Sequence, residues 1–567
     1  MFPRSHAQAS PSVTVENGLA RLRPIRPRSL PKLSYERGRP GSVSLKDSEH
    51  KAAGILASMA CVVLLIVCLA LYLLSRSPRW ELLSLPFQTR IKLLSSSSAL
   101  HDPLLTPLPV PHKSMAALPS RPWDPSEQYL SYLPHSGFHN QRIALENALV
   151  LASILNCTLL VPPVQLGDRP IGYRRSSRLR VNVALSTHIG LEHCALVSDS
   201  RFVPEVCIDL WTHAHVPWDW FVNLSRATRQ HGIRTLVRWD LTDMFLARLR
   251  IFTVDTYFIN DTDPYQFRFF DSRVDTKPLG SRYQERIDIP TLAALSHGYR
   301  LLQFGTLFGT TRIRLVEPAH ILLRTDVRRA MVFANADLLT IADGVRDSTE
   351  LGGMWGYAGV HLRLGDGVFA SGEVRARNVR HVWWKLVRAL GVNDEVALDV
   401  EKRSTKGKSR ERTLLPPNIT ALRAPHPPPP AIPPNLPHAC GRIAPHPLFD
   451  IPLYIATDKP GHHALSLFTR SFPCVYFLSN FSSHLAHLRE MYAPPSDDTR
   501  SQAFQPNLSQ NLPRSDIRLA PFLPPFLDAI IASKARVVAG TPGSTFSSFM
   551  EDVLWRAYHH WDIVQRG

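Results

Sequence analysis

The stretch that decides the fold runs from Tyr132 to Val164 and reads YLPHSGFHNQRIALENALVLASILNCTLLVPPV. It opens with a polar loop, continues with apolar residues at helical spacing, and ends with a short aliphatic run that two prolines close. This pattern predicts a helix with its apolar face through Ala144–Leu155 and a buried strand at Thr158–Val161. The polar residues before the helix are the first candidates for function.

Four later runs repeat the strand pattern. They are YAGVHL at 357–362, LYIAT at 453–457, VYFL at 475–478 and ARVVAG at 535–540. A helix is expected after 453–457, and FSSFMEDVLWRAYHH is expected to form another after the last run. Buried strands that alternate with helices predict an α/β protein with parallel sheets.

The positive charge of the chain is concentrated outside these predicted elements. A length of 567 residues predicts two or more folded units, and the net charge is +18. Residues 1–51 hold ten basic and four acidic side chains, residues 75–125 six and three, and residues 399–447 eight and three. These segments carry +14 of the +18. Basic tails are normally solvated, so the sequence predicts no nucleic-acid partner.

One segment, Ala52–Leu74, is predicted to be a transmembrane helix. Its 23 residues carry no charge, and that length is enough to cross a bilayer. A buried core helix is the alternative, which Lys51 and Arg76 at the two ends disfavour. The basic excess before the segment predicts a disordered cytoplasmic tail at 1–51, and therefore a lumenal domain on a stem at 75–125.

The cysteines and glycosylation sequons that follow this segment fit a lumenal domain. Six Asn-x-Ser/Thr sequons occur, at Asn156, Asn223, Asn260, Asn418, Asn480 and Asn507. The five cysteines are an odd number, so at least one lacks a partner within the chain. Cys194 and Cys207 are the first choice for a local disulfide, although spacing leaves the connectivity open. No Cys-x-x-Cys or Cys/His cluster points to zinc.

A Pro-rich insert is predicted at 399–447. Twelve prolines lie between Pro416 and Pro447, directly after the basic run EKRSTKGKSRER. This composition predicts a disordered surface insertion. A docking site for a protein partner is the alternative, and it would make the chain a membrane-tethered interaction protein.

Polar side chains occupy four positions at the ends of predicted elements, where parallel α/β sheets bind ligands. At the first, the helix after HSGFHN has no Pro or acidic residue in its first turn, so its N–H groups favour an anion. Gly137 would allow a ligand to approach closely, and Asn140 would add a directed hydrogen bond. A plain turn with a helix cap is the alternative.

The second position is GVHLRLGDG at 359–367, where Arg363 follows a buried strand. A guanidinium there can bind two phosphate oxygens through parallel hydrogen bonds. An ion pair between Arg363 and Asp366 that ties the loop is the alternative.

The third and fourth positions follow the strands at 453–457 and 535–540. In YIATDKPG, Asp458 suits a ribose hydroxyl or a purine N–H, or else caps a helix. In VVAGTPGSTFSSF, Ser544 and Thr545 begin a helix, where they either cradle a phosphate or act as an ordinary cap. Together the four positions predict a site for a nucleoside diphosphate.

The sequence Asp261-Thr-Asp263 has the Asp-x-Asp form of metal-dependent sugar transferases. It lies in a sequon beside Pro264, with no buried strand next to it. These features predict a surface turn and no metal site.

GFHNQRIALENALVLASILNCTLLVPP, HLRLGD, ATDKPG and GSTFSSF resemble, in order and spacing, the motifs of the GDP-fucose protein O-fucosyltransferase family. The resemblance implies a GT-B fold, in which two Rossmann-like domains face a cleft. Here these domains would be 126–345 and 346–567, the second of them interrupted by the Pro-rich insert. The resemblance further implies an inverting, metal-independent fucosyltransferase that uses GDP-fucose as donor substrate and needs no cofactor.

The partners implied are GDP-fucose, a protein or glycan acceptor, and the membrane, through one helix. The implied location is the Golgi or endoplasmic reticulum membrane, with type II topology and a lumenal catalytic part. The alternative is a membrane protein of the same fold that binds a nucleotide sugar or a glycan without turnover.

Carried over by position, the family motifs place Arg363 on the phosphates, where it would stabilise the departing diphosphate. Asn140 would face the sugar, and His139 or His135 would be the base that activates the acceptor. Asp458 would contact the nucleoside. The remaining residues of the predicted donor site are Gly137, Phe138, His361, Asp366, Ser544, Thr545 and Phe546. A glycosyl bond that breaks through an oxocarbenium-like state needs such fixed donors at the leaving phosphate.

Overall fold

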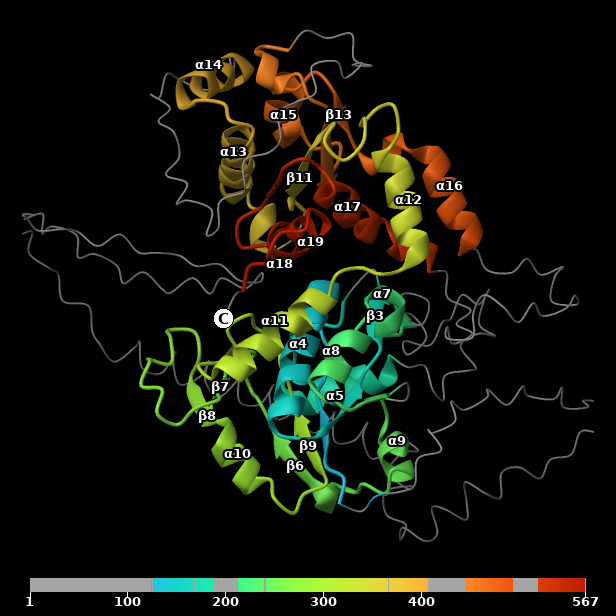
Figure 1. Cartoon of the computed structure of the whole chain (residues 1–567), viewed down its shortest axis with the longest axis vertical. Coiled ribbons are helices and arrows are strands. Elements are labelled where there is room, and N and C mark those ends of the chain that lie inside the picture. Colours follow the sequence, from blue (N-terminus) through green and yellow to red (C-terminus); the bar gives the residue numbers. More distant parts are fainter. Residues whose placement is uncertain are drawn as a thin grey trace, which may run out of the picture. The chain divides into compact units, whose positions relative to one another are not determined.

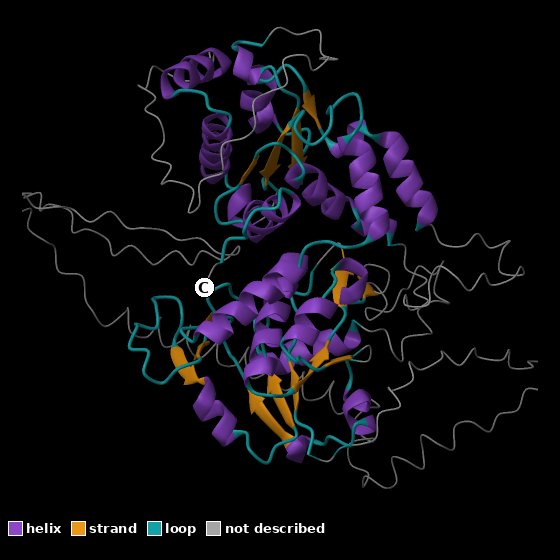
Figure 2. Cartoon of the chain, viewed as in Figure 1, coloured by secondary structure: helices purple, strands orange, loops and turns teal. Residues whose placement is uncertain are grey.

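Two parallel sheets organise the part of the chain that the structure describes (Figures 1 and 2). The structure is a computed structural model, and it describes residues 124, 126–167, 170–186, 213–238, 241–365, 367–405, 444–492 and 519–565. These residues all belong to one compact unit of the chain. The prediction of an α/β protein with parallel sheets is confirmed.

The first sheet has five strands in the order β5-β2-β1-β9-β6, and every neighbouring pair is parallel. In the register at its centre, Tyr129 lies opposite Thr158 on one side and Leu301 on the other. The strands are β1 (Tyr129–Ser131), β2 (Thr158–Val161), β5 (Thr235–Val237), β6 (Thr256–Ile259) and β9 (Leu301–Phe304).

The second sheet has four strands in the order β13-β12-β11-β14, again all parallel. His361 near the end of β11 lies opposite Ala456 of β12 and Gly540 of β14. The carboxyl ends of these three strands therefore meet at one edge of the sheet. The strands are β11 (Ala358–Leu362), β12 (Leu453–Thr457), β13 (Val475–Tyr476) and β14 (Val538–Gly540).

Two smaller sheets accompany them. Strands β10, β7 and β8 form a parallel sheet, and β3 pairs with β4 in antiparallel fashion. Their bounds are β3 (Val164–Gly167), β4 (His213–Val216), β7 (Phe267–Phe270), β8 (Glu285–Asp288) and β10 (Ile313–Arg314).

Helices pack against these sheets (Figure 2, purple). The α-helices are α4 (Phe138–Ile154), α5 (Ser176–Leu185), α7 (Trp218–Phe221), α8 (Ser225–Gln230), α9 (Asp243–Arg248), α10 (Ile289–Leu295), α11 (Pro318–Ala330), α12 (Ala336–Arg346), α13 (Gly372–Ala389), α14 (Asp394–Thr405), α15 (Ser466–Ser471), α16 (Ser482–Met491), α17 (Pro524–Ser533), α18 (Thr545–Phe549) and α19 (Trp555–Tyr558). Short 3-10 turns are η3 (Thr253–Asp255), η4 (Gly367–Ala370), η5 (Pro447–Phe449), η6 (His463–Leu465), η7 (Leu478–Asn480) and η9 (Ala520–Phe522).

Helix α4 begins at Phe138, six residues before the apolar stripe that predicted it. The residues from Phe138 onward, which the sequence predicts as a polar loop, are the first turn of this helix. They are helical because the Phe138 ring packs among Trp218, Phe221, Phe333 and Phe526. Polar residues of α4 are buried too, and one of them joins α4 to α11. Glu146, 2% exposed, pairs with Arg142 of its own helix and accepts from Arg328 at 3.2 Å.

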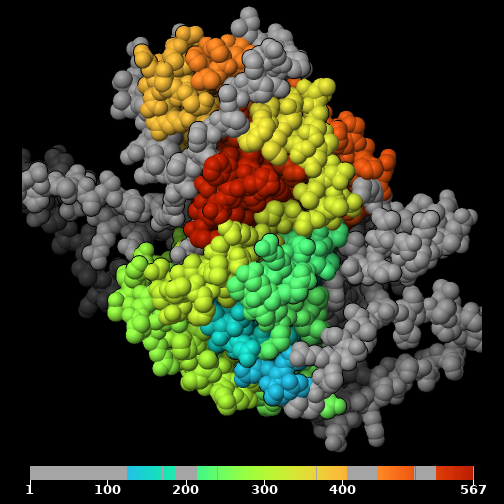
Figure 3. Space-filling model, in the orientation of Figure 1, coloured from blue at the N-terminus to red at the C-terminus, as the bar shows by residue number. Residues whose placement is uncertain are grey.

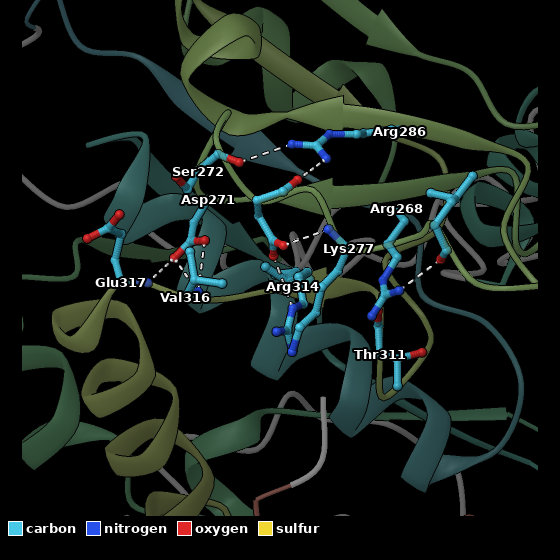
Figure 4. A network of polar contacts seen from close by, with 12 residues as sticks. Arg268, Asp271, Ser272, Lys277, Arg286, Thr311, Arg314, Val316 and Glu317 are labelled. Atoms are coloured by element: carbon cyan, nitrogen blue, oxygen red, sulfur yellow. Dashed lines mark hydrogen bonds and ion pairs between the residues drawn. The ribbon is translucent and has the colours of Figure 1, made fainter.

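The start of α11 is held by the sheet beside it (Figure 4). The Asp271 carboxylate, just after β7, accepts from the backbone N–H groups of Val316 and Glu317 at 3.0 Å. Arg286 of β8 donates to the carbonyl of Ser272 at 3.1 Å, so the loop after Asp271 is fixed as well. An acid at a helix N-terminus satisfies N–H groups that otherwise lack partners.

Three predicted elements differ in the structure. The helix expected over 546–560 is divided into α18, a π-helical turn at Met550–Leu554, and α19. The strand at 475–478 ends at Tyr476, because the side chain of Asn480 accepts from the N–H of Phe477 and turns the chain into η7. The strand at 535–540 begins only at Val538.

The predicted insert 399–447 is shorter than expected, because α14 continues through its first seven residues to Thr405. Glu401 explains this: it is 2% exposed, pairs with Arg380 and accepts from the indole of Trp384 at 3.0 Å. The rest of the insert up to residue 443 lies outside the described residues, as do the tail 1–51, the predicted span 52–74 and almost all of the stem 75–125.

No helix within the described ranges is long and apolar enough to cross a membrane. Cys157 is free and buried, and Cys474 is disulfide-bonded. Cys194 and Cys207 lie outside the described ranges. The domain boundary at 345/346 stays a prediction.

Candidate active site

The segment that carries Arg363 lies between the ends of two neighbouring strands. The backbone N–H of Arg363 donates to the hydroxyl of Thr541, which lies just after β14, at 3.0 Å. The N–H of Thr541 in turn donates to the carbonyl of His361 at 3.1 Å. The Arg363 guanidinium lies 5.4 Å from the centre of the Phe369 ring. The predicted phosphate arginine therefore stands beside the chain that enters the Ser544 turn.

Ser544 is the N-cap of α18. Its side chain is 1% exposed and its hydroxyl accepts from the N–H of Ser547 at 3.3 Å. Gly543 before it has φ of 76°, a conformation that side chains rarely adopt. The Ser544 hydroxyl therefore acts as an ordinary helix cap, which is one of the two roles that the sequence predicts for it. Its contact with a phosphate stays a prediction.

Thr545 joins the first and fourth motifs. Its hydroxyl donates to the side-chain oxygen of Asn140 at 3.3 Å, across 405 residues of sequence. Asn140 lies in the first turn of α4 and is half-buried. The residues predicted to face the sugar and the phosphate are therefore in direct contact.

Phe546 brings the second motif into the same cluster. Its ring lies 4.4 Å from that of His361 and 4.5 Å from that of His139, measured between centroids. His361 is also held by Ser547, whose hydroxyl lies 2.6 Å from Nδ1. Residues of α4, β11 and α18 thus surround one aromatic ring.

Both histidines of this cluster are neutral at pH 7. Burial and the nearby Arg363 lower the pKa of His361 to about 3. Burial, Arg142, His361 and Arg363 lower the pKa of His139 well below 6.5. Neither buried ring nitrogen of His139 has a hydrogen-bond partner in the part of the chain that the structure describes. With so low a pKa, His139 is a weak base.

Asp458 makes a contact that the sequence does not indicate. One carboxylate oxygen accepts from the N–H of Leu364 at 2.9 Å, and the other from the N–H of Gly365 at 2.8 Å. Asp458 itself is exposed. It therefore binds the segment that carries Arg363, and its predicted contact with a nucleoside stays a prediction.

Three further predicted residues have different settings. Gly137 is exposed, and a Cβ built on it meets nothing within 4 Å, so open space adjoins the mouth of α4. Phe138 does not line that space, because its side chain is 9% exposed and packs in the apolar core. Asp366 lies outside the described residues.

His135, the second candidate base, is enclosed by partners from the first sheet. It is 3% exposed, and its ring nitrogens contact the hydroxyls of Ser136 at 2.8 Å and Thr306 at 2.6 Å. Burial and Arg312 lower its pKa to about 3. Ser136 has φ of 65°, which is unusual for a residue other than glycine.

Arg142, one of the polar residues at the mouth of the first predicted helix, and Arg328 line a pocket at this place. The pocket of about 490 Å³, which includes space open to solvent, is lined by Arg142, Arg328, Gly543, Thr545, Ser548 and Asp552, among others. The Arg142 guanidinium lies 4.2 Å from the centre of the Phe549 ring. Figure 3 shows α11 beside the C-terminal segment, which Arg328 joins through the carbonyl of Val564 at 3.5 Å. Arg142 follows Gln141 in the first motif, whereas no signal in the sequence marks Arg328.

The predicted turn is present at Thr262, which is exposed, and at Asp263, which accepts from the N–H of Tyr265 at 2.9 Å, but Asp261 is not on the surface. Asp261 follows β6 and is 2% exposed; it accepts from the Tyr173 hydroxyl at 2.8 Å and from the N–H of Thr306. Burial raises the pKa of its carboxyl. No group of three or more His, Cys, Asp or Glu that could hold a metal ion occurs among the residues with described positions.

Comparison with known proteins gives one short match in sequence. A stretch of 38 residues is 53% identical to O-fucosyltransferase 30 of Arabidopsis thaliana. This stretch is 7% of the present chain and 8% of that protein, so the chain matches less than a tenth of its relative's length. No family model matches the chain.

Among solved structures, POFUT1 in complex with GDP-fucose is similar to the chain with a TM-score of 0.31 and 11% identity. The match covers 77% of this chain and 96% of POFUT1. The apo form of POFUT1 gives a TM-score of 0.28 at 11% identity, over 75% and 94% of the two chains. At TM-scores this low, the two folds are not shown to be the same.

Proposed function

We propose that the chain is an inverting glycosyltransferase that transfers fucose from GDP-fucose to a hydroxyl of a protein or a glycan. One observation carries the proposal: Phe546 lies against both His139 and His361, so three motifs distant in the sequence meet at one place. The four motifs that resemble the O-fucosyltransferase family, and the 38-residue match to O-fucosyltransferase 30, support fucose as the sugar.

The proposed fold is of the GT-B type, with the donor between the ends of the two large parallel sheets. Arg363 and the turn at Gly543–Thr545 bind the diphosphate, and Asn140 hydrogen-bonds to the sugar. As the bond between C1 of fucose and the phosphate breaks, negative charge grows on the GDP oxygen, where a fixed guanidinium stabilises it most. The acceptor hydroxyl attacks C1 from the opposite face and releases its proton to solvent, so the configuration inverts.

The proposed location is the membrane of the Golgi or the endoplasmic reticulum, with the catalytic part in the lumen. The six sequons and the apolar segment 52–74 support this proposal. Digestion with a glycosidase tests it: lumenal sequons predict a faster-migrating band after treatment, and an unchanged band contradicts the topology.

The proposed reaction is tested with the full chain, radiolabelled GDP-fucose, and protein and glycan acceptors. We expect transfer of label by the wild type, and a rate reduced roughly 10- to 100-fold in Arg363→Ala, the loss expected for a charged hydrogen bond. Arg388→Ala is the matched control, because Arg388 pairs with Asp394 on the surface. Preference for another nucleotide sugar, or normal transfer by Arg363→Ala, would contradict the proposal.

A second function is favoured by the weak basicity of His139. A protein of this fold that binds a nucleotide sugar or a glycan without turnover needs no base. Saturable binding of GDP-fucose without transfer to any acceptor, and without hydrolysis to free fucose, would support this alternative over the enzyme.

A further inference from the structure

The segment Arg363–Gly365 is attached to the strands on both sides of it. Strand β11 lies between β14 and β12, and three successive N–H groups leave its end. The first, of Arg363, donates to the Thr541 hydroxyl on the β14 side at 3.0 Å. The next two, of Leu364 and Gly365, donate to the two carboxylate oxygens of Asp458 on the β12 side at 2.9 and 2.8 Å.

Both side chains make more than one hydrogen bond to this segment and the end of β11. The Thr541 hydroxyl also donates to the carbonyl of His361 at 3.1 Å, so it bridges two backbone groups of the same strand end. Each oxygen of Asp458 accepts one N–H, and hydrogen bonds to an ionised carboxylate are shorter and stronger than neutral ones.

Arg375 of α13 holds the same segment from a third side. Its Nε donates to the carbonyl of Leu364 at 3.2 Å, and its Nη2 donates to the carbonyl of Ala370 at 2.6 Å. Both backbone groups of Leu364 are therefore bonded to charged side chains, one acidic and one basic.

Gly365 permits the close approach of Asp458. A Cβ at this position would lie 2.7 Å from Oδ2 of Asp458 and 3.0 Å from Cε of Lys459. Any larger residue would push the carboxylate away from the two N–H groups. The glycine and the acid form a matched pair, although 93 residues separate them.

We infer that Asp458 is a positioning residue: with Thr541 and Arg375 it fixes the backbone from which Arg363 reaches the diphosphate. This inference rests on the proposed function, because it concerns the same diphosphate site. This role is additional to the nucleoside contact that the family resemblance implies for Asp458, and the two roles can be measured separately.

The test compares two probes, guanosine and GDP, by titration calorimetry with the full chain. Asp458→Asn keeps the size of the side chain, but its amide has only one oxygen to accept the two N–H groups. We expect it to weaken GDP binding about tenfold more than guanosine binding, the effect of losing one hydrogen bond to a charged group.

A second arm uses coupling with Arg363. If Asp458 acts through Arg363, Asp458→Asn has no further effect on GDP affinity in an Arg363→Ala background. Gly365→Ala disturbs the same contact from the other partner and is expected to reproduce the selective loss for GDP. Gly461→Ala is its control, because a Cβ there meets nothing within 4 Å.

Equal losses for guanosine and GDP, or additive losses in the double variant, would overturn the inference and assign Asp458 to the nucleoside. A wild type that binds neither probe would overturn the proposed function as well. If the wild type binds GDP and the variants behave as just described, only the inference fails. If the wild type does not bind GDP, the proposed function fails too.

Discussion

At the scale of single residues, the site combines a charged group with buried neutral rings. The Arg363 guanidinium contributes to lowering the pKa of both His139 and His361, and the imidazoles of these two histidines contact the Phe546 ring. A buried imidazole resists protonation because the charged form loses its hydration. Positive charge at the site is therefore confined to the arginines, which suits an anionic ligand.

These histidines predict how stability depends on pH. His135 and His361 have a pKa of about 3 in the folded protein, against 6.5 for an exposed imidazole. Below pH 6.5 the unfolded chain binds protons that the folded chain does not. The free energy of unfolding therefore decreases as the pH is lowered. Between pH 7 and 5, each histidine accounts for a loss of about 2 kcal/mol.

Urea unfolding at pH 7 and pH 5 measures this effect. In His361→Asn the loss between the two pH values should be smaller than in the wild type by about 2 kcal/mol. The exposed His487→Asn is the control, because that side chain is in water in both states and its replacement should not change the loss. An identical loss in wild type and His361→Asn would show that His361 titrates normally.

The sequence predicts Arg363, Asn140 and Thr545 as site residues, because each follows or begins a recognisable element, and the structure places Thr545 in contact with Asn140. The sequence does not show which role a carboxylate at a strand end has, since that carboxylate can bind a ligand or accept hydrogen bonds from backbone N–H groups of the same chain. Asp458 and Asp261 both prove to accept backbone N–H groups, and only the tertiary neighbours decide this. Arg142 and Arg328 enter the pocket because α4 and α11 pack together, which no local pattern indicates.

At the scale of elements, α4 is the helix on which the N-terminal part of the site depends. It carries Asn140 toward α18 and is joined to α11 by the buried Glu146. One carboxylate between two buried arginines satisfies charges that would otherwise be very costly to bury. The same helix thus supplies the site and the ion pairs that hold it.

Glu146→Ala tests this arrangement. Removing the shared acid leaves Arg142 and Arg328 buried without their common partner, so we expect a loss of about 3–5 kcal/mol in the free energy of unfolding. Asp394→Ala removes the partner of Arg388 from a surface pair and should cost no more than about 1 kcal/mol. Denaturant unfolding compares the two variants, and equal small losses would mean that Glu146 does not link the helices.

Strand β11 makes a second, steric prediction. A Cβ at Gly359 would lie 2.2 Å from the carbonyl oxygen of Ala532 in α17. Gly359→Ala should therefore force α17 away from the sheet and lower the free energy of unfolding by at least about 2 kcal/mol. Gly461→Ala, which has open space, should be neutral; a neutral Gly359→Ala would contradict the packing of α17 on β11.

The predicted elements agree best with the structure where the sequence pattern that predicts them is purely local. The strands at 158–161 and 453–457 have the predicted bounds, because short apolar runs between prolines or turns leave few alternatives. The start of α4 is earlier than predicted, since Phe138 joins a distant aromatic cluster. Helix α14 extends into a charged run that looks solvated, because Arg380 and Trp384 bind Glu401.

At the scale of the whole molecule, segments from both ends of the described sequence meet at one site. Thr545 contacts Asn140, and Arg363 is bonded to Thr541 beside the turn that carries Thr545. The packing of α18 on α4 and the pairing of β14 with β11 bring them together, and neither contact can be derived from the sequence of a single element. We propose a nucleoside diphosphate as the ligand of this cluster.

The binding of GDP to wild type and Arg363→Ala, measured by titration calorimetry with guanosine as reference ligand, tests this assignment most directly. If Arg363 holds the diphosphate, the variant binds GDP roughly 10- to 100-fold more weakly and binds guanosine with unchanged affinity. Equal GDP affinity in the two proteins would contradict it.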